Sequence, residues 1–297
     1  MEKVNLERDY RKSGEGANGD SYDCLADESV MLKMYNRSYP EKLIQEELEV
    51  AGKVYSLGIP SPEPGCIVTD GDRIGIRFRR IVGKRSYARM ISQEPERLEE
   101  YTREFTRHCK LLHSTQCPDG MFPDAKQQFR YFLDCDRVFN DSEKSFMSDF
   151  LDLVPDCSTA VHGDMHVGNL ISTLPAGAPM SQRHTVNFID LGMFARGCPL
   201  LDIGMMQIVC FFSDEDFRRE TCHLTGEQTR AIWDVFVDEY FYSEDCAAEK
   251  WFGPGATPQA VFEGILPYTS LKLFLVEHNC GALFPHFERV IRQTFGF

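Results

Sequence analysis

The residues best suited to chemistry lie in two short segments, HGDMHVGNL at 162–170 and FIDLG at 188–192. They place Asp164, Asn169 and Asp190 in the order and spacing that phosphoryl transfer from a nucleotide to a hydroxyl requires. An Asp near the attacking hydroxyl can accept its proton, while a later Asn and a further Asp can hold magnesium against the phosphates. The pattern therefore predicts a site for phosphoryl transfer.

The residues around these segments predict the strands that must position them. An apolar stretch at 159–161 precedes the first segment, and strand character resumes at Leu170. The second segment ends a strand predicted at 185–189. Asp164 and Asp190 thus follow two short strands and lie 26 residues apart, a hairpin-scale arrangement that can converge on one metal ion.

The pattern HGDxHxxN followed by DxG resembles the aminoglycoside phosphotransferase and choline kinase family, whose members are relatives of the eukaryotic protein kinases. The resemblance implies that Asp164 is the catalytic residue and that Asn169 and Asp190 bind Mg2+. It places His166 where protein kinases have a Lys, and Leu191 where they have the Phe of DFG. HGD alone would be an ordinary turn, because Gly and Asp favour turns. The later Asn and Asp make the phosphotransferase interpretation the favoured one.

The resemblance also implies an α+β, two-lobed protein-kinase-like fold. A small N-terminal lobe at 1–83, with an antiparallel sheet and one helix, would bind the nucleotide and include the hinge. A larger, mainly helical lobe at 84–297 would carry the catalytic and substrate-binding residues. The segment 75–83, a predicted strand that leads into a linker, would be the hinge, where backbone groups contact the nucleobase, so the sequence is compatible with both ATP and GTP.

Lys33 is the candidate phosphate-binding residue of the N-terminal part. A glycine-rich turn at 14–19 is followed by strands predicted at 21–25 and 30–35, and Lys33 lies in the second of these among apolar neighbours. A Lys in a strand is often an edge charge that keeps a sheet soluble. The order of glycine-rich hairpin, strand Lys and helix instead favours phosphate binding.

The glycine-rich turn GEGANG does not follow a strand and open a helix, as the dinucleotide-binding motif does. It lies in a predicted hairpin, which suits a lid over nucleotide phosphates, and its backbone N–H groups can donate to phosphate oxygens. By resemblance, Gly14, Gly16 and Gly19 form the nucleotide loop.

A helix is predicted from Glu41 to Leu57, and its apolar face includes Glu47. A carboxylate on a buried face needs a cationic partner. Lys33 is the natural candidate and would reproduce the strand-Lys to helix-Glu pair of kinases. In the alternative, Glu47 is solvated at the rim of this face, and Glu46 or Glu49 makes the pair.

The remainder of the chain is predicted to be mainly helical. By resemblance, Asp202 is a structural acid that anchors the catalytic loop; on physical grounds an Asp that heads an apolar helix is also an N-cap. His113 is interpreted as a core or helix-end histidine. Amphipathic helices are predicted at 94–112, 129–150 (as one or two helices), 226–242, 259–279 and 285–294.

The composition of the 297 residues, with 42% hydrophobic side chains, is that of an ordinary globular protein. The net charge of −14 lies mostly after residue 83 and disfavours a nucleic-acid partner. It is compatible with a cationic substrate, although many proteins are acidic merely for solubility. Eleven scattered cysteines without a CxxC pair favour reduced thiols in a cytoplasmic protein over disulfides or zinc. We expect no signal peptide and no membrane segment.

The sequence therefore predicts an enzyme that uses Mg2+ to transfer the γ-phosphate of ATP or GTP to a hydroxyl of a small, cationic molecule. Aminoglycosides, choline and amino sugars are the acceptor classes that the resemblance implies. Acidic residues at 234–239 could contact such a cation or form a solvated helix face. A protein Ser/Thr kinase is an alternative, but the short path from Gly192 to Asp202 leaves no room for an activation segment. A non-catalytic nucleotide-binding module is another, but it would have no need of Asp164.

Overall fold

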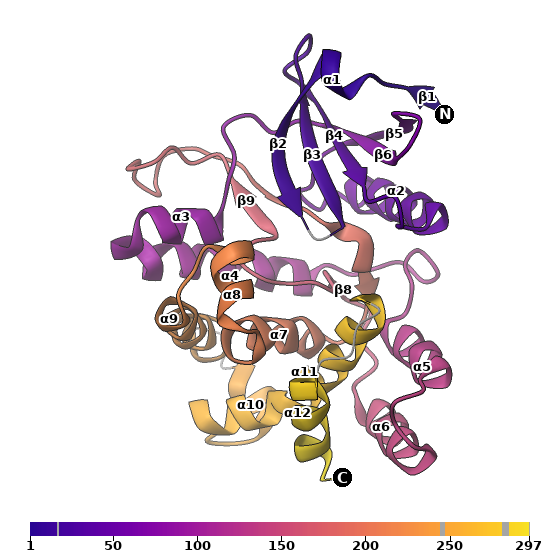
Figure 1. Ribbon diagram of the computed structural model, residues 1–297. Helices are drawn as coiled ribbons and strands as arrows, with labels where there is room; N and C mark the ends of the chain where they lie inside the picture. The colour runs from indigo at the N-terminus through magenta and orange to yellow at the C-terminus, as the bar shows by residue number, and fades with distance from the viewer. Residues whose placement is uncertain (17, 244–246, 281–284, 297) are drawn as a thin grey trace. The chain divides into compact units, whose positions relative to one another are not determined.

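The computed structural model describes residues 1–16, 18–243, 247–280 and 285–296. The chain forms two compact units (Figure 1). Unit 1 consists of Met1–Met90 and Gly168–Met193, and unit 2 of Ile91–Val167 and Phe194–Phe297. The predicted lobes at 1–83 and 84–297 divide the chain by function, whereas the compact units add the hairpin at 168–193 to the N-terminal part. The functional division stays a prediction.

Unit 1 is built on a six-stranded sheet with the order β1-β5-β6-β4-β3-β2. The neighbouring strands are antiparallel, as predicted, except that β1 pairs with β5 in parallel and makes the sheet mixed. A two-residue strand has no periodicity that the sequence could reveal. The strands are β1 (Glu2–Lys3), β2 (Tyr10–Gly16), β3 (Gly19–Cys24), β4 (Val30–Tyr35), β5 (Pro64–Thr69) and β6 (Ile74–Arg79).

The two faces of this sheet bury different side chains, because successive residues of a strand point to opposite faces. On β4, Leu32 and Met34 face one side, and Lys33 and Tyr35 face the other. Helix α2 (Glu41–Ser56) covers the second side, close to its predicted span of 41–57. The first side holds a cluster of Val4, Leu32, Met34 and Val68. The second holds a cluster of Tyr35, Ile44 and Ile76.

A second, three-stranded sheet of unit 1 has the order β10-β9-β7. Strands β9 (Leu170–Ser172) and β10 (Val186–Phe188) are antiparallel, with Phe188 opposite Leu170. They correspond to the strand character predicted from Leu170 and to the strand predicted at 185–189. Unit 1 also contains α1 (Leu6–Asp9), β7 (Arg85–Ser86) and the short helix η2 (Leu191–Met193). Helix α3 (Tyr87–Gln93) begins in unit 1 and ends in unit 2.

Over its described residues, unit 2 is mainly helical, with one short antiparallel pair of strands, β8 (Ala160–Val161) and β11 (Ala195–Arg196). In the same described part, π-helical turns extend or connect the helices: η3 (Ile208–Phe212), η4 (Arg218–Cys222) and η5 (Asp238–Tyr242). Its other helices are η1 (Pro95–Arg97), α4 (Leu98–Ser114), α5 (Ala125–Cys135), α6 (Asp141–Leu153), α7 (Leu200–Gln207), α8 (Glu215–Phe217), α9 (Gly226–Val237), α10 (Ala247–Phe252), α11 (Pro258–Cys280) and α12 (Pro285–Phe295).

Local capping explains where the structure departs from the predicted helix bounds. Of the one or two helices predicted over 129–150 the structure has two, because the Asn140 side chain accepts from the Glu143 backbone N–H at 3.0 Å and starts α6 there. The helix expected from Glu94 begins only at Leu98, after the 3-10 turn η1, which starts with Pro95.

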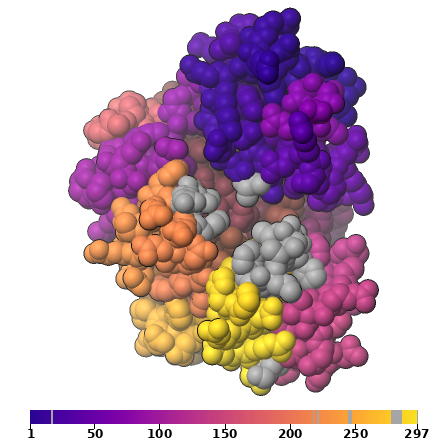
Figure 2. Space-filling view, in the orientation of Figure 1, coloured from indigo at the N-terminus to yellow at the C-terminus, as the bar shows by residue number. Residues whose placement is uncertain are grey.

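The last helix, α12, packs on α6 through aromatic contacts. The ring of Phe295 lies 5.8 Å from that of Phe146 and 5.6 Å from that of Phe150, measured between centroids. Both helices contribute to the outer surface in the space-filling view, α12 in yellow and α6 in magenta (Figure 2). Among the described residues, no helix has both the length and the apolar character needed to cross a bilayer.

Two glycines of unit 1 offer a test of how closely β6 packs against β4. A Cβ at Gly75 of β6 would lie 2.4 Å from the Met34 sulfur and 2.6 Å from the Lys33 carbonyl oxygen, whereas a Cβ at Gly52 of α2 meets nothing within 4 Å. We expect Gly75→Ala to lower the free energy of unfolding by about 1–3 kcal/mol through overpacking. We expect Gly52→Ala to raise it by about 0.5–1 kcal/mol through helix propensity. Urea unfolding measures both; equal midpoints for Gly75→Ala and the native protein would contradict the packing.

Candidate functional site

Lys33 of β4 is held by two carboxylates of unit 1. Its ammonium nitrogen lies 2.7 Å from Glu47 Oε1 and 2.8 Å from Asp190 Oδ1. Burial would lower the pKa of Lys33, but the charges of Asp190 and Glu47 hold it well above its ordinary value. The side chain is therefore a fixed cation whose position is set by Glu47 of α2 and by Asp190, two residues after β10.

Glu47 makes the pair with Lys33, as the helix periodicity predicted. Its side chain is only 5% exposed, so the alternative of a solvated rim position does not hold. Glu46 and Glu49 bond to lysines of their own helix, at 3.5 Å to Lys42 and 2.5 Å to Lys53.

Gly192 of the DxG element lies close to the same buried carboxylate. A Cβ at Gly192 would lie 3.1 Å from Glu47 Oε2, which is closer than ordinary van der Waals contact. A larger residue would therefore press on the carboxylate that holds Lys33.

Asn169 and Asp190 lie at the same end of the β9–β10 hairpin. Asn169 directly precedes β9, Asp190 follows β10 by two residues, and the Ile189 N–H donates to the Asn169 carbonyl at 3.0 Å. Asp190 adopts φ = 60°, the left-handed conformation that Asp tolerates better than most residues. Strained backbone of this kind is common at functional sites.

The donor atoms of this pair suit Mg2+. The ion prefers oxygen ligands and is usually held by one or two carboxylates together with phosphates and water. Asp190 supplies a carboxylate and Asn169 an amide oxygen. Over the residues that the structure describes, no group of three His, Cys, Asp or Glu side chains is arranged to hold a metal ion.

The three predicted loop glycines all lie on the β2–β3 hairpin, where Gly14 is opposite Ser21 and Gly16 is opposite Gly19. Ser21 is in turn opposite Lys33, so the hairpin and the lysine share one region of the sheet. Only Gly19 of the three is demanded by packing, because a Cβ there would lie 2.1 Å from the Met34 carbonyl oxygen. Ala17 of the predicted loop lies outside the described residues.

In unit 2, the turn that follows β8 is anchored by Asp202 of α7. The Asp202 carboxylate accepts from the backbone N–H groups of His162 at 2.6 Å and Gly163 at 2.8 Å. It also bonds to Nε2 of His113 at 3.0 Å, and the other ring nitrogen of His113 lies 2.8 Å from the Tyr240 hydroxyl. Asp202 is therefore the anchor that the resemblance implied; the N-cap of α7 is Pro199 instead.

This turn sets the position of Asp164. Gly163 adopts φ = 83°, a left-handed conformation that favours glycine. The Asp164 N–H donates to His162 Nδ1 at 3.3 Å, and the Asp164 carboxylate lies 3.9 Å from Nε2 of His166. The side chain of Asp164 is one-third exposed, which leaves it accessible from solvent.

Lys272 of α11 is a contact of this turn that the sequence analysis missed. Its ammonium group donates to the carbonyl oxygen of Gly163, and the residue is only 4% exposed. The signal that could have revealed it is a cation inside the apolar run SLKLFLV at 270–276.

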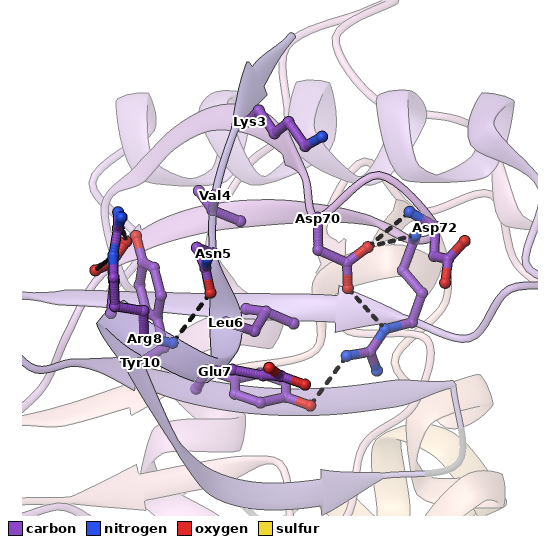
Figure 3. Close-up of a pocket in the computed structure, with 12 residues that line it drawn as sticks. Lys3, Val4, Asn5, Leu6, Glu7, Arg8, Tyr10, Asp70 and Asp72 are labelled. Atoms are coloured by element: carbon purple, nitrogen blue, oxygen red, sulfur yellow. Dashed lines mark hydrogen bonds and ion pairs between the residues drawn. The ribbon is translucent and has the colours of Figure 1, made fainter.

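The pocket drawn in Figure 3 lies elsewhere in unit 1, along the segment from Lys3 to Tyr10 and the turn from Asp70 to Arg73. This segment includes Val4, which packs on the face of the sheet opposite Lys33. The carboxylate of Asp70 is already engaged by the Arg73 backbone at 2.7 Å. None of the residues predicted to do chemistry lines the pocket, so it is not the candidate site.

Comparison with solved structures shows the kinase-like fold of the aminoglycoside kinases. The chain is similar to the amicoumacin kinase hAmiN in complex with AMP-PNP and Ca2+, with 15% identity, a TM-score of 0.54, and coverage of 100% of this chain and 89% of that chain. For a thermostable mutant of APH(4)-Ia with ADP and hygromycin B, the identity is 12%, the TM-score 0.57, and the coverage 96% and 94%. For APH(2")-IIa with gentamicin, the identity is 15%, the TM-score is 0.54, and the match covers 100% of this chain and 96% of that chain.

The chain belongs to the phosphotransferase enzyme family, whose profile matches residues 9–236. This match spans more than half of the chain and confirms the family resemblance read from the segments at 162–170 and 188–192. A comparison with curated protein sequences gives no significant match.

The anchor at Asp202 predicts an acid-sensitive stability. Burial would raise the pKa of Asp202, but the hydrogen bond and charge of His113, with the charges of His162 and Lys272, hold it below its ordinary value. Stability from such a carboxyl is present above the unfolded-state pKa of about 3.9 and is lost as pH falls through the lower folded-state value.

We therefore expect Asp202→Asn to lower the free energy of unfolding by about 3–5 kcal/mol at pH 6, with a smaller loss at pH 3. Urea unfolding of both proteins from pH 6 to pH 3 measures the difference. A difference that stays constant over this range would show that the charge of Asp202 does not contribute.

Proposed function

We propose that this protein uses Mg2+ to transfer the γ-phosphate of ATP or GTP to a hydroxyl of a small molecule. The observation that carries the proposal is the Lys33 cation, fixed at 2.7 Å from Glu47 and 2.8 Å from Asp190 on a sheet whose adjoining hairpin contains the glycine-rich turn. Membership of the phosphotransferase family supports it.

In the proposed mechanism, the residues of unit 1 hold the nucleotide phosphates. Lys33, positioned by Glu47, contacts the α- and β-phosphates. The backbone of the β2–β3 hairpin donates to phosphate oxygens. Packing within the protein does not exclude a side chain at Gly14 or Gly16. The absence of side chains there instead lets a ligand approach the backbone closely.

The pair at the end of the β9–β10 hairpin completes this half of the proposed site. Asn169 and Asp190 would hold Mg2+ through their side-chain oxygens, the kind of ligand that this ion prefers. Bound Mg2+ supplies positive charge against the phosphate oxygens. Asp190 already lies beside the Lys33 cation, which keeps its carboxylate oriented toward the phosphate-binding residues.

Asp164 acts on the acceptor in this mechanism. It accepts a hydrogen bond from the acceptor hydroxyl, orients the oxygen toward the γ-phosphate and takes its proton. Because the transition state of phosphoryl transfer is loose, correct positioning contributes more than strong base catalysis. The rigid turn anchored by Asp202 supplies that positioning.

The proposed acceptor is a small cationic molecule with a hydroxyl group. Solved structures with the same fold hold hygromycin B and gentamicin, which supports a small-molecule acceptor. The net charge of −14 supports a cationic one. After η2, only the two-residue strand β11 precedes α7, so this part of the chain does not form the long activation segment of a protein kinase.

A direct test is phosphoryl transfer from ATP or GTP with Mg2+ to a panel containing choline, glucosamine, hygromycin B and gentamicin, with water as the reference acceptor. We expect one nucleotide and at least one acceptor to give a phosphorylated product detectable by mass spectrometry. Binding of Mg2+-nucleotide without transfer to any acceptor or to water would favour a binding module over an enzyme.

Two carboxylates should separate binding from chemistry. We expect Asp164→Ala to lower kcat by about 10²- to 10⁴-fold while leaving Mg2+-nucleotide binding nearly intact. We expect Asp190→Ala to abolish transfer and also to weaken Mg2+-dependent nucleotide binding. Asp152→Ala is the matched control, because Asp152 is an exposed carboxylate of α6 paired with Arg130. Full activity in either Asp164→Ala or Asp190→Ala would remove the mechanism.

Glu47 should affect nucleotide binding through Lys33. In Glu47→Gln the side chain keeps its shape but loses the charge that orients the ammonium group, so we expect the nucleotide KM to rise about tenfold, equivalent to about 1.4 kcal/mol. Glu49→Gln on the same helix is the control, since Glu49 is exposed and pairs with Lys53. Steady-state kinetics with varied nucleotide measures both; equal KM values would contradict the role of Glu47.

A further inference from the structure

Lys272 is a buried lysine that the mechanism above does not use. It lies on α11, is 4% exposed, and follows and precedes leucines that are themselves buried. An ammonium group in apolar surroundings is costly unless it is hydrogen-bonded and balanced by negative charge. Its bond to the Gly163 carbonyl oxygen places it directly on the turn that carries Asp164.

The packing of α7 on α11 brings Lys272 to this turn. A Cβ at Gly204 of α7 would lie 2.9 Å from the backbone nitrogen of Thr269, so the glycine permits an unusually close approach of the two helices. Gln207 of α7 ties them further, because its Nε2 donates to the Phe262 carbonyl at 3.0 Å and its Oε1 accepts from the Thr269 hydroxyl. The two helices therefore hold Asp202 and Lys272 in a fixed relation.

Asp202 and Lys272 hold opposite sides of one turn. Asp202 accepts from the N–H groups of His162 and Gly163, and Lys272 donates to the C=O of Gly163. That carbonyl belongs to the peptide whose N–H is Asp164's own. Rotation of this peptide plane would redirect the Asp164 side chain, and the Lys272 bond opposes such a rotation.

The charges around Lys272 come from the turn and from α7. Burial lowers the pKa of Lys272, while the negative charges of Asp202 and Asp164 act to raise it. Beyond Asp202 lie His113 of α4 and His162 of the turn, whose positive character also acts on that carboxylate. The negative charges of the structural Asp202 and of the proposed catalytic Asp164 thus both act on Lys272.

We propose that Lys272 is a positioning residue for Asp164, which it orients by holding the Gly163–Asp164 peptide plane and by presenting an ammonium charge to the Asp164 carboxylate. This inference rests on the proposed phosphotransferase function. It assigns α11, which the family match at residues 9–236 does not include, a part in orienting the acceptor hydroxyl.

The test compares Lys272→Met with Lys126→Met. Lys126 is the matched control, because it also donates to a backbone carbonyl, that of Val154 at 2.7 Å, and to a carboxylate, that of Asp156 at 2.8 Å. We expect Lys272→Met to lower kcat by about 10- to 100-fold, as a displaced catalytic group would, while the nucleotide KM stays within about twofold of native. Lys126→Met should keep the native kcat.

The pH profile separates positioning by a charged amine from a merely structural role. Lys272 loses its ammonium charge as pH rises through its lowered pKa. We therefore expect the kcat of the native protein to fall at alkaline pH, with a midpoint below the ordinary lysine pKa of about 10.4. Lys272→Met should lack this alkaline fall.

Lys272→Gln provides a second variant that retains an N–H donor without the charge. We expect its kcat to lie between those of Lys272→Met and the native protein. Equal kcat values for Lys272→Gln and Lys272→Met, or an alkaline fall that persists in Lys272→Met, would overturn the inference. So would a native kcat in Lys272→Met.

The assay uses Mg2+-ATP and Mg2+-GTP with choline, glucosamine, hygromycin B, gentamicin and water as acceptors, and every variant is first checked for native circular dichroism. If the native protein transfers phosphate to none of these, the proposed function itself fails. If the native protein is active and Lys272→Met matches it, only the assignment of Lys272 fails.

Discussion

The need to neutralise the cation of Lys33 organises unit 1. An ammonium group on the inner face of a sheet must be matched by negative charge, and two carboxylates from distant parts of the sequence supply it: Glu47 from α2 and Asp190 from the end of β10. Their attraction keeps the pKa of Lys33 well above its ordinary value despite burial. The same three groups therefore tie the sheet, helix α2 and the β9–β10 hairpin together, and they leave little room for a side chain at Gly192.

In unit 2 the corresponding requirement is to provide hydrogen-bond partners for the backbone of the turn that follows β8. Once the chain passes Val161, the N–H and C=O groups of the turn have no ladder partner, and buried backbone groups without partners are destabilising. Asp202 accepts from two of the N–H groups, and Lys272 donates to a C=O. The side chains that satisfy the turn are thus the same ones that fix Asp164, so stability and orientation have a common origin.

Much of this could be predicted because the relevant signals are local. The 3.6-residue period of α2 placed Glu47 on the buried face, and strand alternation placed Lys33 opposite it. The HGDxHxxN and DxG segments indicated the family that the profile match confirms. Lys272 was missed because its partner lies 109 residues away, and a lysine in a helix gives no sign of which carbonyl it will reach. The strand β1 was missed because a two-residue pairing has too little periodicity to detect, and periodicity alone left open whether 129–150 is one helix or two. The roles of Asn169, Asp190 and the loop glycines remain predictions.

The most direct test of the central claim, that Lys33 with its two carboxylates forms a phosphate- and magnesium-binding site, is thermal unfolding with ATP or GTP in the presence and absence of Mg2+. A nucleotide at 100 times its dissociation constant stabilises the folded protein by about 2.7 kcal/mol. The account predicts a clear rise in the unfolding temperature that depends on Mg2+ for at least one nucleotide. An unfolding temperature that neither nucleotide changes, with or without the metal, would contradict it.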